Sequence, residues 1–399
     1  MTPQELRSSF SLASIFALRM LGLFLVLPVF ALEAKGYAGG QDAARVGLAM
    51  GVYGLTQALL QLPFGLASDR FGRKPMIVIG LLVFLAGSLV AALATSLDGL
   101  MVGRSLQGAG AVSAAVTALL ADQTRDGVRT KSMALVGGGI GLMFALSLVL
   151  APLLVAHIGL SGLFGLTAVL ALAGVVIIIW WTPAETAGHA QPSRGSLADV
   201  LRNAALLRLN LGVFVLHAVQ LAMWMAVPAM LVQAGLPREH HWWVYLPAVL
   251  ASFGVMGATL FPLERRGYLR AVFLVSVGLV TLVQVGLMLG AGSAPGLGAL
   301  GALLFIFFCG FNVLEASQPS LVSRLAPAAS RGAALGVYNT LQSLGLFAGG
   351  ALGGLLISRI GAHGLFAVST SAMLLWLALA WPMRVPAGGA HLPAAAEAA

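Results

Sequence analysis

The sequence predicts an all-α membrane protein with twelve transmembrane helices arranged as two parallel six-helix repeats. Hydrophobic residues make up 59% of the 399 residues and charged residues only 9%, whereas soluble domains carry roughly 25% charged residues. Apolar stretches of about 20 residues, long enough to cross a bilayer as a helix, recur along the whole chain. Charged loops of the first half also return at matching places in the second half.

Twelve apolar segments follow one another, with short polar breaks such as 96–98 and 237–241 between them. The longest break, 182–208, contains several Pro and Gly residues and divides the segments six and six. We therefore expect a first half over 1–181, a linker over 182–208 that can hold a short helix at 196–207, and a second half over 209–385. The tail 386–399 is rich in Ala, Gly and Pro and is expected to be disordered. The segments are 12–32, 45–67, 75–95, 99–121, 133–156, 160–181, 209–233, 242–263, 270–291, 297–321, 332–357 and 362–383.

The two halves repeat one another around two loops. The charged loop at 69–72 corresponds to the loop at 264–267, 195 residues later, with an acidic residue, Arg and Gly at matching places. The start of the fifth segment after Lys131 corresponds to the start of the eleventh after Arg331, 200 residues later. Matching loops in matching order predict two parallel repeats around a central site.

Basic residues predict the orientation of the chain in the membrane. If the N-terminus is cytoplasmic, four basic residues face the outside, namely Lys35, Arg45, Arg238 and Arg359, and sixteen face the cytoplasm. The remaining two, Arg19 and Arg104, lie inside segments. Because basic residues concentrate in cytoplasmic loops, both termini and the linker are expected to be cytoplasmic. The sixteen are Arg7, Arg70, Arg73, Lys74, Arg125, Arg129, Lys131, Arg194, Arg202, Arg208, Arg265, Arg266, Arg270, Arg324, Arg331 and Arg384.

Several classes of function are disfavoured by what the sequence lacks. A single cysteine, Cys309, excludes an internal disulfide framework and any Cys-based metal site, and His240-His241 have no partners at metal-ligand spacing. The net charge of +9 is spread over short loops, so no nucleic-acid partner is expected. No phosphate-binding loop of the G-x-x-x-x-G-K-[ST] type and no nucleophile–base set is present. We therefore expect no cofactor, no metal and no enzymatic activity.

The densest charge cluster lies in the loop between the second and third segments, at 65–75. Gly72 permits a sharp turn there, and Pro75 suits the first turn of the following helix. On charge alone, this loop can be a solvated turn that obeys the positive-inside rule. A carboxylate such as Asp69 can also be stabilised by the N-terminus of a neighbouring helix, and the eleventh segment begins on the same side, at Arg331 and Gly332.

Two motifs carry a resemblance to a known family. The loop reads G-x-L-A-S-D-R-x-G-R-K from Gly65, and the fourth segment reads L-x-x-x-R-x-x-Q-G through Leu100, Arg104, Gln107 and Gly108. Both match signatures of the major facilitator superfamily, each at the expected helix. The chain as a whole, over roughly residues 10–385, resembles the bacterial YajR-type transporters of the drug:proton antiporter branch. The resemblance implies a multi-pass protein of the inner (cytoplasmic) membrane.

In that family the loop is thought to act as a conformational latch between the halves. The resemblance implies that Asp69 faces the start of the eleventh helix when the site opens outward, and that Arg73 pairs with Asp122 at the end of the fourth. Release of the latch would accompany opening toward the cytoplasm, as a bistable interface requires. The expected latch residues are Gly65, Asp69, Arg70, Gly72, Arg73, Lys74, Asp122, Arg331 and Gly332.

Glycines crowd the fifth and eleventh segments, where small residues let helices approach closely. They can form a static packing contact or a sliding seam between the halves. The antiporter signature of the family ends the fifth helix with Gly-Pro followed by two glycines, but here Ala151 precedes Pro152, and Leu154-Val155 replace the glycine pair. This departure weakens the implication of antiport. The expected seam residues are Gly137, Gly141, Pro152, Gly345, Gly349 and Gly353.

Ionisable residues inside the membrane are costly and usually face a cavity or a partner. Arg19, Arg104, His217 and Glu315 fall one each on the first, fourth, seventh and tenth segments, which line the cavity in the family. Glu315 is the only deep carboxylate; it can carry protons or neutralise a buried Arg. His217 can be a hydrogen-bonded packing residue, and Arg104 belongs to the signature linked to proton coupling in the family.

These observations favour a proton-coupled secondary transporter that exports small lipophilic compounds by antiport. Aromatic residues on the cavity helices, such as Phe24 and Phe311, favour a lipophilic substrate if they face the cavity. Proton symport or facilitated uptake of a metabolite is the alternative within transport. A membrane sensor or scaffold that no longer transports is the alternative outside it. The expected partners are the lipid bilayer, protons and a small-molecule substrate, with the chain acting as a monomer.

Overall fold

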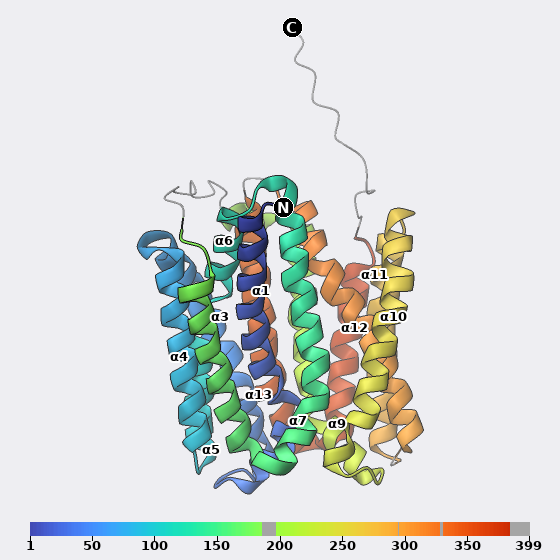
Figure 1. Cartoon of the computed structure of the whole chain (residues 1–399). Helices are drawn as coiled ribbons and strands as arrows, with labels where there is room; N and C mark the ends of the chain where they lie inside the picture. The colour runs from blue at the N-terminus through green and yellow to red at the C-terminus, as the bar shows by residue number, and fades with distance from the viewer. Residues whose placement is uncertain (186–196, 294, 328–329, 384–399) are drawn as a thin grey trace.

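The computed structural model describes residues 1–185, 197–293, 295–327 and 330–383, which form a bundle of helices (Figure 1). The elements of the first half are α1 (Pro3–Phe24), α2 (Leu27–Glu33), η1 (Ala34–Gly36), α3 (Ala43–Phe71), α4 (Arg73–Leu93), α5 (Leu97–Ala109), α6 (Ser113–Asp122), α7 (Asp126–Val176) and the π-helix η2 (Ile177–Trp181). The elements of the second half are α8 (Leu197–Arg202), α9 (Ala204–Gln233), η3 (Arg238–His240), α10 (Trp242–Arg265), α11 (Leu269–Ala291), α12 (Leu297–Leu325) and α13 (Arg331–Ala380).

These helices supply the twelve predicted spans. Among the described residues, eight helical stretches are long and apolar enough to cross a membrane. Two of them, α7 with 51 residues and α13 with 50, hold more than twice the ~20 residues that one span needs. Each therefore holds two spans, joined at one glycine with a non-helical backbone, Gly159 or Gly361. The more polar α3 and the broken pair α5–α6 supply the last two.

The helix that carries the seventh span begins inside the predicted linker 182–208. The helix α9 begins at Ala204, five residues before the predicted start of the seventh segment, because the side chain of Asn203 caps the backbone N–H groups of Ala205 and Leu206. The short predicted helix appears as α8, and the tail 386–399 lies outside the described residues.

The twofold repeat extends to the backbone and to the contacts of the loops. Gly72 and Gly267 both have positive φ, 97° and 84°, so each loop turns where only glycine is unstrained. After the first loop, Lys74 Nζ donates to the carbonyl of Thr182 (2.9 Å) at the end of the sixth span. After the second, Arg270 Nε donates to the carbonyl of Met383 (2.8 Å) at the end of the twelfth. The halves are thus built alike.

The start of α1 and the end of α13 lie on the same face, uppermost in Figure 1. We call it the terminal face and the other the opposite face. Toward the opposite face, α3 and α13 cross so closely that their glycines touch backbone to backbone. Gly47 and Gly51 of α3 meet Gly350 and Gly354 of α13. This contact joins the two halves.

Of the two alternatives for the glycines of the fifth and eleventh segments, this state shows packing contacts for those of the eleventh. Gly345, Gly349 and Gly353 lie against the backbone of α9, which belongs to the same half, so in this state they pack helices within the second half. Gly137 is exposed, and nothing lies within 4 Å of a Cβ placed there. Gly141 lies near Phe253 of the other half, 3.8 Å from such a Cβ.

Enlarging Gly350 tests whether the contact between α3 and α13 keeps the opposite face closed. A methyl group there would lie 2.7 Å from the Cα of Gly51, so Gly350→Ala should force the helices apart. Spin labels at Thr95 and Ser293, exposed residues of the two halves near the opposite face, should then show a longer mean distance. Gly336→Ala is the matched control, because nothing lies within 4 Å of its added carbon. An unchanged distance in Gly350→Ala would contradict this role.

Candidate functional site

Three helices of the second half bring together the polar cluster around Glu315. His217 of α9 places Nε2 3.3 Å from Oε2 of Glu315 on α12. The side-chain amide nitrogen of Gln342, on α13, lies 2.8 Å from His217 Nε2 and 3.1 Å from Oε1 of Glu315. Glu315 keeps 37% of its side chain exposed, whereas His217 keeps only 5%. The Glu315 side chain is therefore partly exposed, although its Oε2 is buried.

The hydrogen bonds of the cluster leave room for one more proton. His217 Nδ1 lies 2.9 Å from the carbonyl of Val213 and donates to it, so Nε2 of the neutral ring is an acceptor. Gln342 has two amide hydrogens and can donate to both His217 and Glu315. Glu315 Oε2 then faces His217 Nε2 without a donor between them, and it has no hydrogen-bond partner among the residues that the structure describes. A proton added to either atom supplies that donor.

This arrangement separates the alternatives left open for Glu315. Its partners are His217 and Gln342, so Glu315 does not neutralise a buried arginine in this state. Sequence reasoning missed Gln342, because a neutral amide in an apolar helix carries no charge that marks it as unusual.

The two intramembrane arginines form a second cluster, inside the first half. Arg19 donates to the hydroxyl groups of Ser113 (2.9 Å) and Tyr53 (2.8 Å). Arg104 donates to Gln107 (3.1 Å) and to the carbonyl of Met50 (3.2 Å), and its guanidinium lies over the ring of Tyr53. Both arginines are only 1% exposed. Within the part of the chain that the structure describes, their partners are neutral.

The sequence placed four ionisable residues on the cavity helices, and the structure divides them between the halves. Arg19 and Arg104 point into the first half, where Tyr53 lies between them. His217 and Glu315 meet in the second half. Gln107 supports the first cluster by donating to Ser88 (2.9 Å). Tyr53 was not singled out from the sequence; a tyrosine inside an apolar segment was its only signal.

Aromatic rings bridge the two halves close to the Glu315 cluster. Phe144 of α7 packs edge-on against Phe24 of α1 at 5.2 Å between ring centres, and against Phe308 of α12 at 6.0 Å. Phe311 lies one turn further along α12, 6.3 Å from Phe144 and 6.0 Å from the His217 ring. A buried apolar cluster therefore lies next to His217 and Glu315.

The latch loop at 65–75 is tied within the first half. Arg73 pairs with Asp69 and with Asp122 (3.4 Å), and also donates to Ser68 (2.8 Å). Arg331, at the start of α13, donates to the carbonyl of Ser323 (2.9 Å) in its own half. In the described residues, no ion pair or hydrogen bond joins Asp69 to Arg331 or Gly332. The structure thus brings together Asp69, Arg73 and Asp122 but leaves α13 apart.

The remaining latch residues of the 65–75 loop make contacts within the turn or with neighbouring segments of the first half. Arg70 lies over the ring of Phe71 (5.4 Å), and Gly72 ends α3. The backbone N–H of Lys74, in the first turn of α4, donates to the carboxylate of Glu185 at the start of the linker. Gly65 lies near Ala114 of α6, 3.7 Å from a Cβ placed there.

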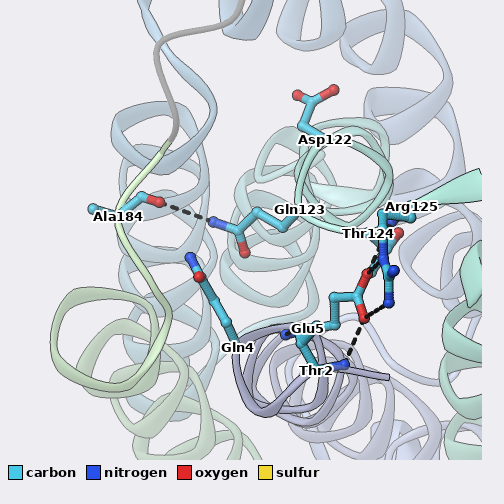
Figure 2. A pocket seen from close by; sticks show the side chains of 8 residues that line it. All are labelled: Thr2, Gln4, Glu5, Asp122, Gln123, Thr124, Arg125 and Ala184. Carbon is cyan, nitrogen blue, oxygen red and sulfur yellow. Dashed lines mark hydrogen bonds and ion pairs between the residues drawn. The ribbon is translucent and has the colours of Figure 1, made fainter.

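A small cavity of about 240 Å³ lies next to this loop at the terminal face (Figure 2). Arg125 binds Glu5 of α1 at 2.7 Å, and Gln123 donates to the carbonyl of Ala184 (3.3 Å). The hydrogen bonds from Arg125 are the main cause that lowers the pKa of Glu5 to about 2, so this pair stays charged at physiological pH. The segment 122–125 therefore fastens α1, the latch loop and the linker to one another.

The second half carries the same tie with the charges exchanged. Glu264 occupies the position of Asp69 in the repeat, and it pairs with Arg324 at the end of α12. In the first half, a basic residue of the loop binds an acidic residue at the end of α6. Each tie therefore holds a loop to a helix end of its own half.

At the opposite face, an ion pair crosses between the halves. Arg238 of η3 binds Glu33 of α2 at 2.5 Å. Together with the glycine contact of α3 and α13, this pair closes the opposite face. The ties described at the terminal face all stay within one half. The protein is therefore held in a state that is closed at the opposite face.

Comparisons with known proteins identify the family. Residues 12–350 match the model of the Major Facilitator Superfamily. The chain belongs to the major facilitator superfamily. It is 41% identical to the inner membrane transport protein YajR of Escherichia coli (strain K12) over 97% of this chain and 85% of that protein. It is 28% identical to the multidrug resistance protein MdtH of Aeromonas salmonicida over 86% of each chain.

Solved structures of the superfamily share the fold. A D-xylose-proton symporter aligns with a TM-score of 0.77 at 15% identity, over 95% of this chain and 98% of the other. The human organic anion transporter MFSD10 (TETRAN) aligns with a TM-score of 0.67 at 20% identity, over 95% of this chain and 100% of the other. The predicted twelve-helix fold and the assignment to a transporter family are thereby confirmed; these relatives are transporters, not enzymes.

The ion pair between Arg238 and Glu33 predicts a simple test of closure in this superfamily member. Exposed pairs contribute roughly 0.2–1 kcal/mol, so Glu33→Gln should lower the population closed at the opposite face by up to several-fold, measured with spin labels at Thr95 and Ser293. Asp98→Asn is the matched control, because Asp98 pairs with Arg45 at 2.5 Å within the first half. A larger shift in Asp98→Asn than in Glu33→Gln would contradict the assignment.

Proposed function

We propose that this chain is a monomeric, proton-coupled exporter of small lipophilic compounds in a bacterial inner membrane, working by alternating access. The observation that carries the proposal is the open proton position between Glu315 and His217, half-way along the spans. A half-exposed carboxylate that lacks one donor is suited to take up and release a proton. The adjoining rings of Phe144 and Phe311 are buried between the halves in this state and would form an apolar surface for a substrate where the halves part.

The orientation follows from the basic residues. Sixteen of them favour the terminal face as the cytoplasmic one. The state described here is then closed toward the outside, which fits the separation of Asp69 from α13. In the outward-open state, the halves would part at Gly350 and meet at the latch instead.

Transport of the substrate would be coupled to that of the proton because the two bind at the Glu315 cluster in turn. A proton arriving from outside neutralises Glu315, and deprotonation on the cytoplasmic side restores a charged carboxylate beside the apolar rings. A substrate that binds one protonation form better shifts the equilibrium between states by that difference in affinity. The multidrug resistance name of one relative supports export as the direction.

Symport is the second candidate, because the end of the fifth span departs from the antiporter signature of the family. Ala151 and Leu154-Val155 stand where the antiporter signature of the family has glycines, and Ala151 is fully buried. A proton symporter or a facilitator of a metabolite would use the same Glu315 cluster with both ligands moving together. A protein that binds but does not transport would show no flux at all.

Flux in proteoliposomes under an imposed pH gradient tests the coupling. Using ethidium as a lipophilic probe, Glu315→Gln should lose pH-driven transport at least about tenfold, since it cannot change charge, while exchange of ethidium without a pH gradient persists. Glu239→Gln, outside the cluster at the opposite face, is the control. Full pH-driven flux in Glu315→Gln would rule out the proton role. Flux in the same direction as protons would favour symport, and no flux in the folded wild type would favour the sensor or scaffold.

The latch predicts a second conformational effect. A carboxylate at the start of α13 would stabilise the outward-open state by roughly 0.3–2 kcal/mol, less than the ~5.5 kcal/mol that fully switches a two-state system. Asp69→Asn should therefore raise, several-fold, the population that is closed at the opposite face relative to the outward-open one, measured from the distances between spin labels at Thr95 and Ser293. Asp122→Asn should have the same effect, because it releases Arg73. Glu264→Gln, in the second-half loop, should have a smaller effect. No shift in Asp69→Asn would leave the loop as an ordinary charged turn.

A further inference from the structure

The three helices that hold the Glu315 cluster each carry a second polar residue nearer the terminal face. On α9, Asn210 precedes His217 by seven residues; on α13, Tyr338 precedes Gln342 by four; on α12, which runs the other way, Gln318 follows Glu315 by three. Spacings of three, four and seven residues return to the same side of a helix. Asn210, Gln318 and Tyr338 therefore lie on the side of their helices that carries the Glu315 cluster, about 4–10 Å nearer the terminal face at 1.5 Å per residue. We call these three residues the second polar layer.

This second polar layer is buried, and its side-chain polar atoms are unpaired in the part of the chain that the structure describes. Gln318 is 0% exposed, and Asn210 and Tyr338 are each 1% exposed. Both amide atoms of Asn210, both of Gln318 and the hydroxyl of Tyr338 have no hydrogen-bond partner among the described residues. Five unpaired polar atoms in one layer would cost much free energy. Buried polar groups in native proteins are satisfied by protein or by ordered water.

One member of the layer, Tyr338, lies near Glu315, whose Oε2 lacks a partner among the described residues. Oε2 of Glu315 is buried and has no hydrogen-bond donor, and Tyr338 lies close enough to Glu315 for the two to interact electrostatically. His217 and Tyr338 are the titratable groups that face Glu315 from α9 and α13. The sequences of α10 and α11 place ionisable residues only near their ends, and Arg19 and Arg104 point into the first half.

We propose that Asn210, Gln318 and Tyr338 bind a cluster of ordered water molecules that solvates Glu315 from its buried side and sets the pH at which Glu315 takes up its proton. Water fits the chemistry, because the layer offers both donors and acceptors, and water is both. Hydrogen bonds donated to a carboxylate favour its charged form. The proposal rests on the proposed function only for the biological use of that proton; the water itself is independent of transport.

Hydroxyl-radical footprinting of the full-length protein in nanodiscs tests for the water. Radicals formed from bound water oxidise a neighbouring tyrosine even when bulk solvent does not reach it. Tyr338 should be oxidised several-fold faster than Tyr53, which is similarly buried but whose hydroxyl accepts a hydrogen bond from Arg19. Gln318→Leu should reduce oxidation of Tyr338 several-fold. Gln284→Leu is the matched control, because Gln284 is also fully buried with both amide atoms unpaired among the described residues. It lies on α11 two residues before Gly286, which packs against Leu303 near the start of α12, away from the layer.

An infrared titration of the Glu315 carboxyl band, assigned with Glu315→Gln, tests the effect on the proton. Tyr338→Phe and Gln318→Leu should each move the midpoint upward by about half a pH unit or more, and Gln284→Leu should not move it. Tyr338→Phe removes one oxygen and keeps the ring, so it preserves the fold. Equal oxidation of Tyr338 and Tyr53, or unchanged midpoints in both layer variants, would overturn the proposal. Both readouts hold whether or not ethidium is transported, so they separate this proposal from that of the function.

Discussion

The contact on which this state depends is the crossing of α3 and α13, where glycine meets glycine and the two backbones touch. Nothing larger than a hydrogen atom fits between Gly51 and Gly350. Such close approach lets van der Waals packing act between whole helices in a membrane, where no hydrophobic force draws them together. The ion pair of Arg238 with Glu33 and the rings around Phe144 lie on the same closed side of the Glu315 cluster, so they add to a contact already made by the main chain.

Charge is distributed unequally between the halves, and this shapes the site. The first half buries two arginines whose described partners are neutral, with Tyr53 between them. The second half buries a histidine beside the single deep carboxylate. The first half thus carries a fixed positive charge on its two buried arginines, whereas the second half holds the group that can change its charge. This division gives the two structurally similar repeats different tasks.

The sequence predicted the twelve spans and the repeat because the membrane leaves few alternatives: each span must be a helix of about 20 residues that satisfies its own backbone. It also predicted Glu315 and His217, since ionisable residues stand out in apolar segments. It did not predict Gln342, Tyr338 or Asn210, because neutral polar residues are common in such helices and their meeting depends on helix rotation. The glycine seam shows the same limit: Gly349 and Gly350 differ by one residue, yet about 100° of rotation turns one toward α9 and the other toward α3.

The joints at Gly159 and Gly361 have a mechanical consequence. Each is a single residue with positive φ at which one helix passes directly into the next, so no loop separates the fifth span from the sixth or the eleventh from the twelfth. A joint without loop residues has little length to absorb a shift, so a displacement of one span at the opposite face is passed to its neighbour. The glycines where α3 and α13 touch lie toward the same face, so a separation of the halves there involves both spans of α13.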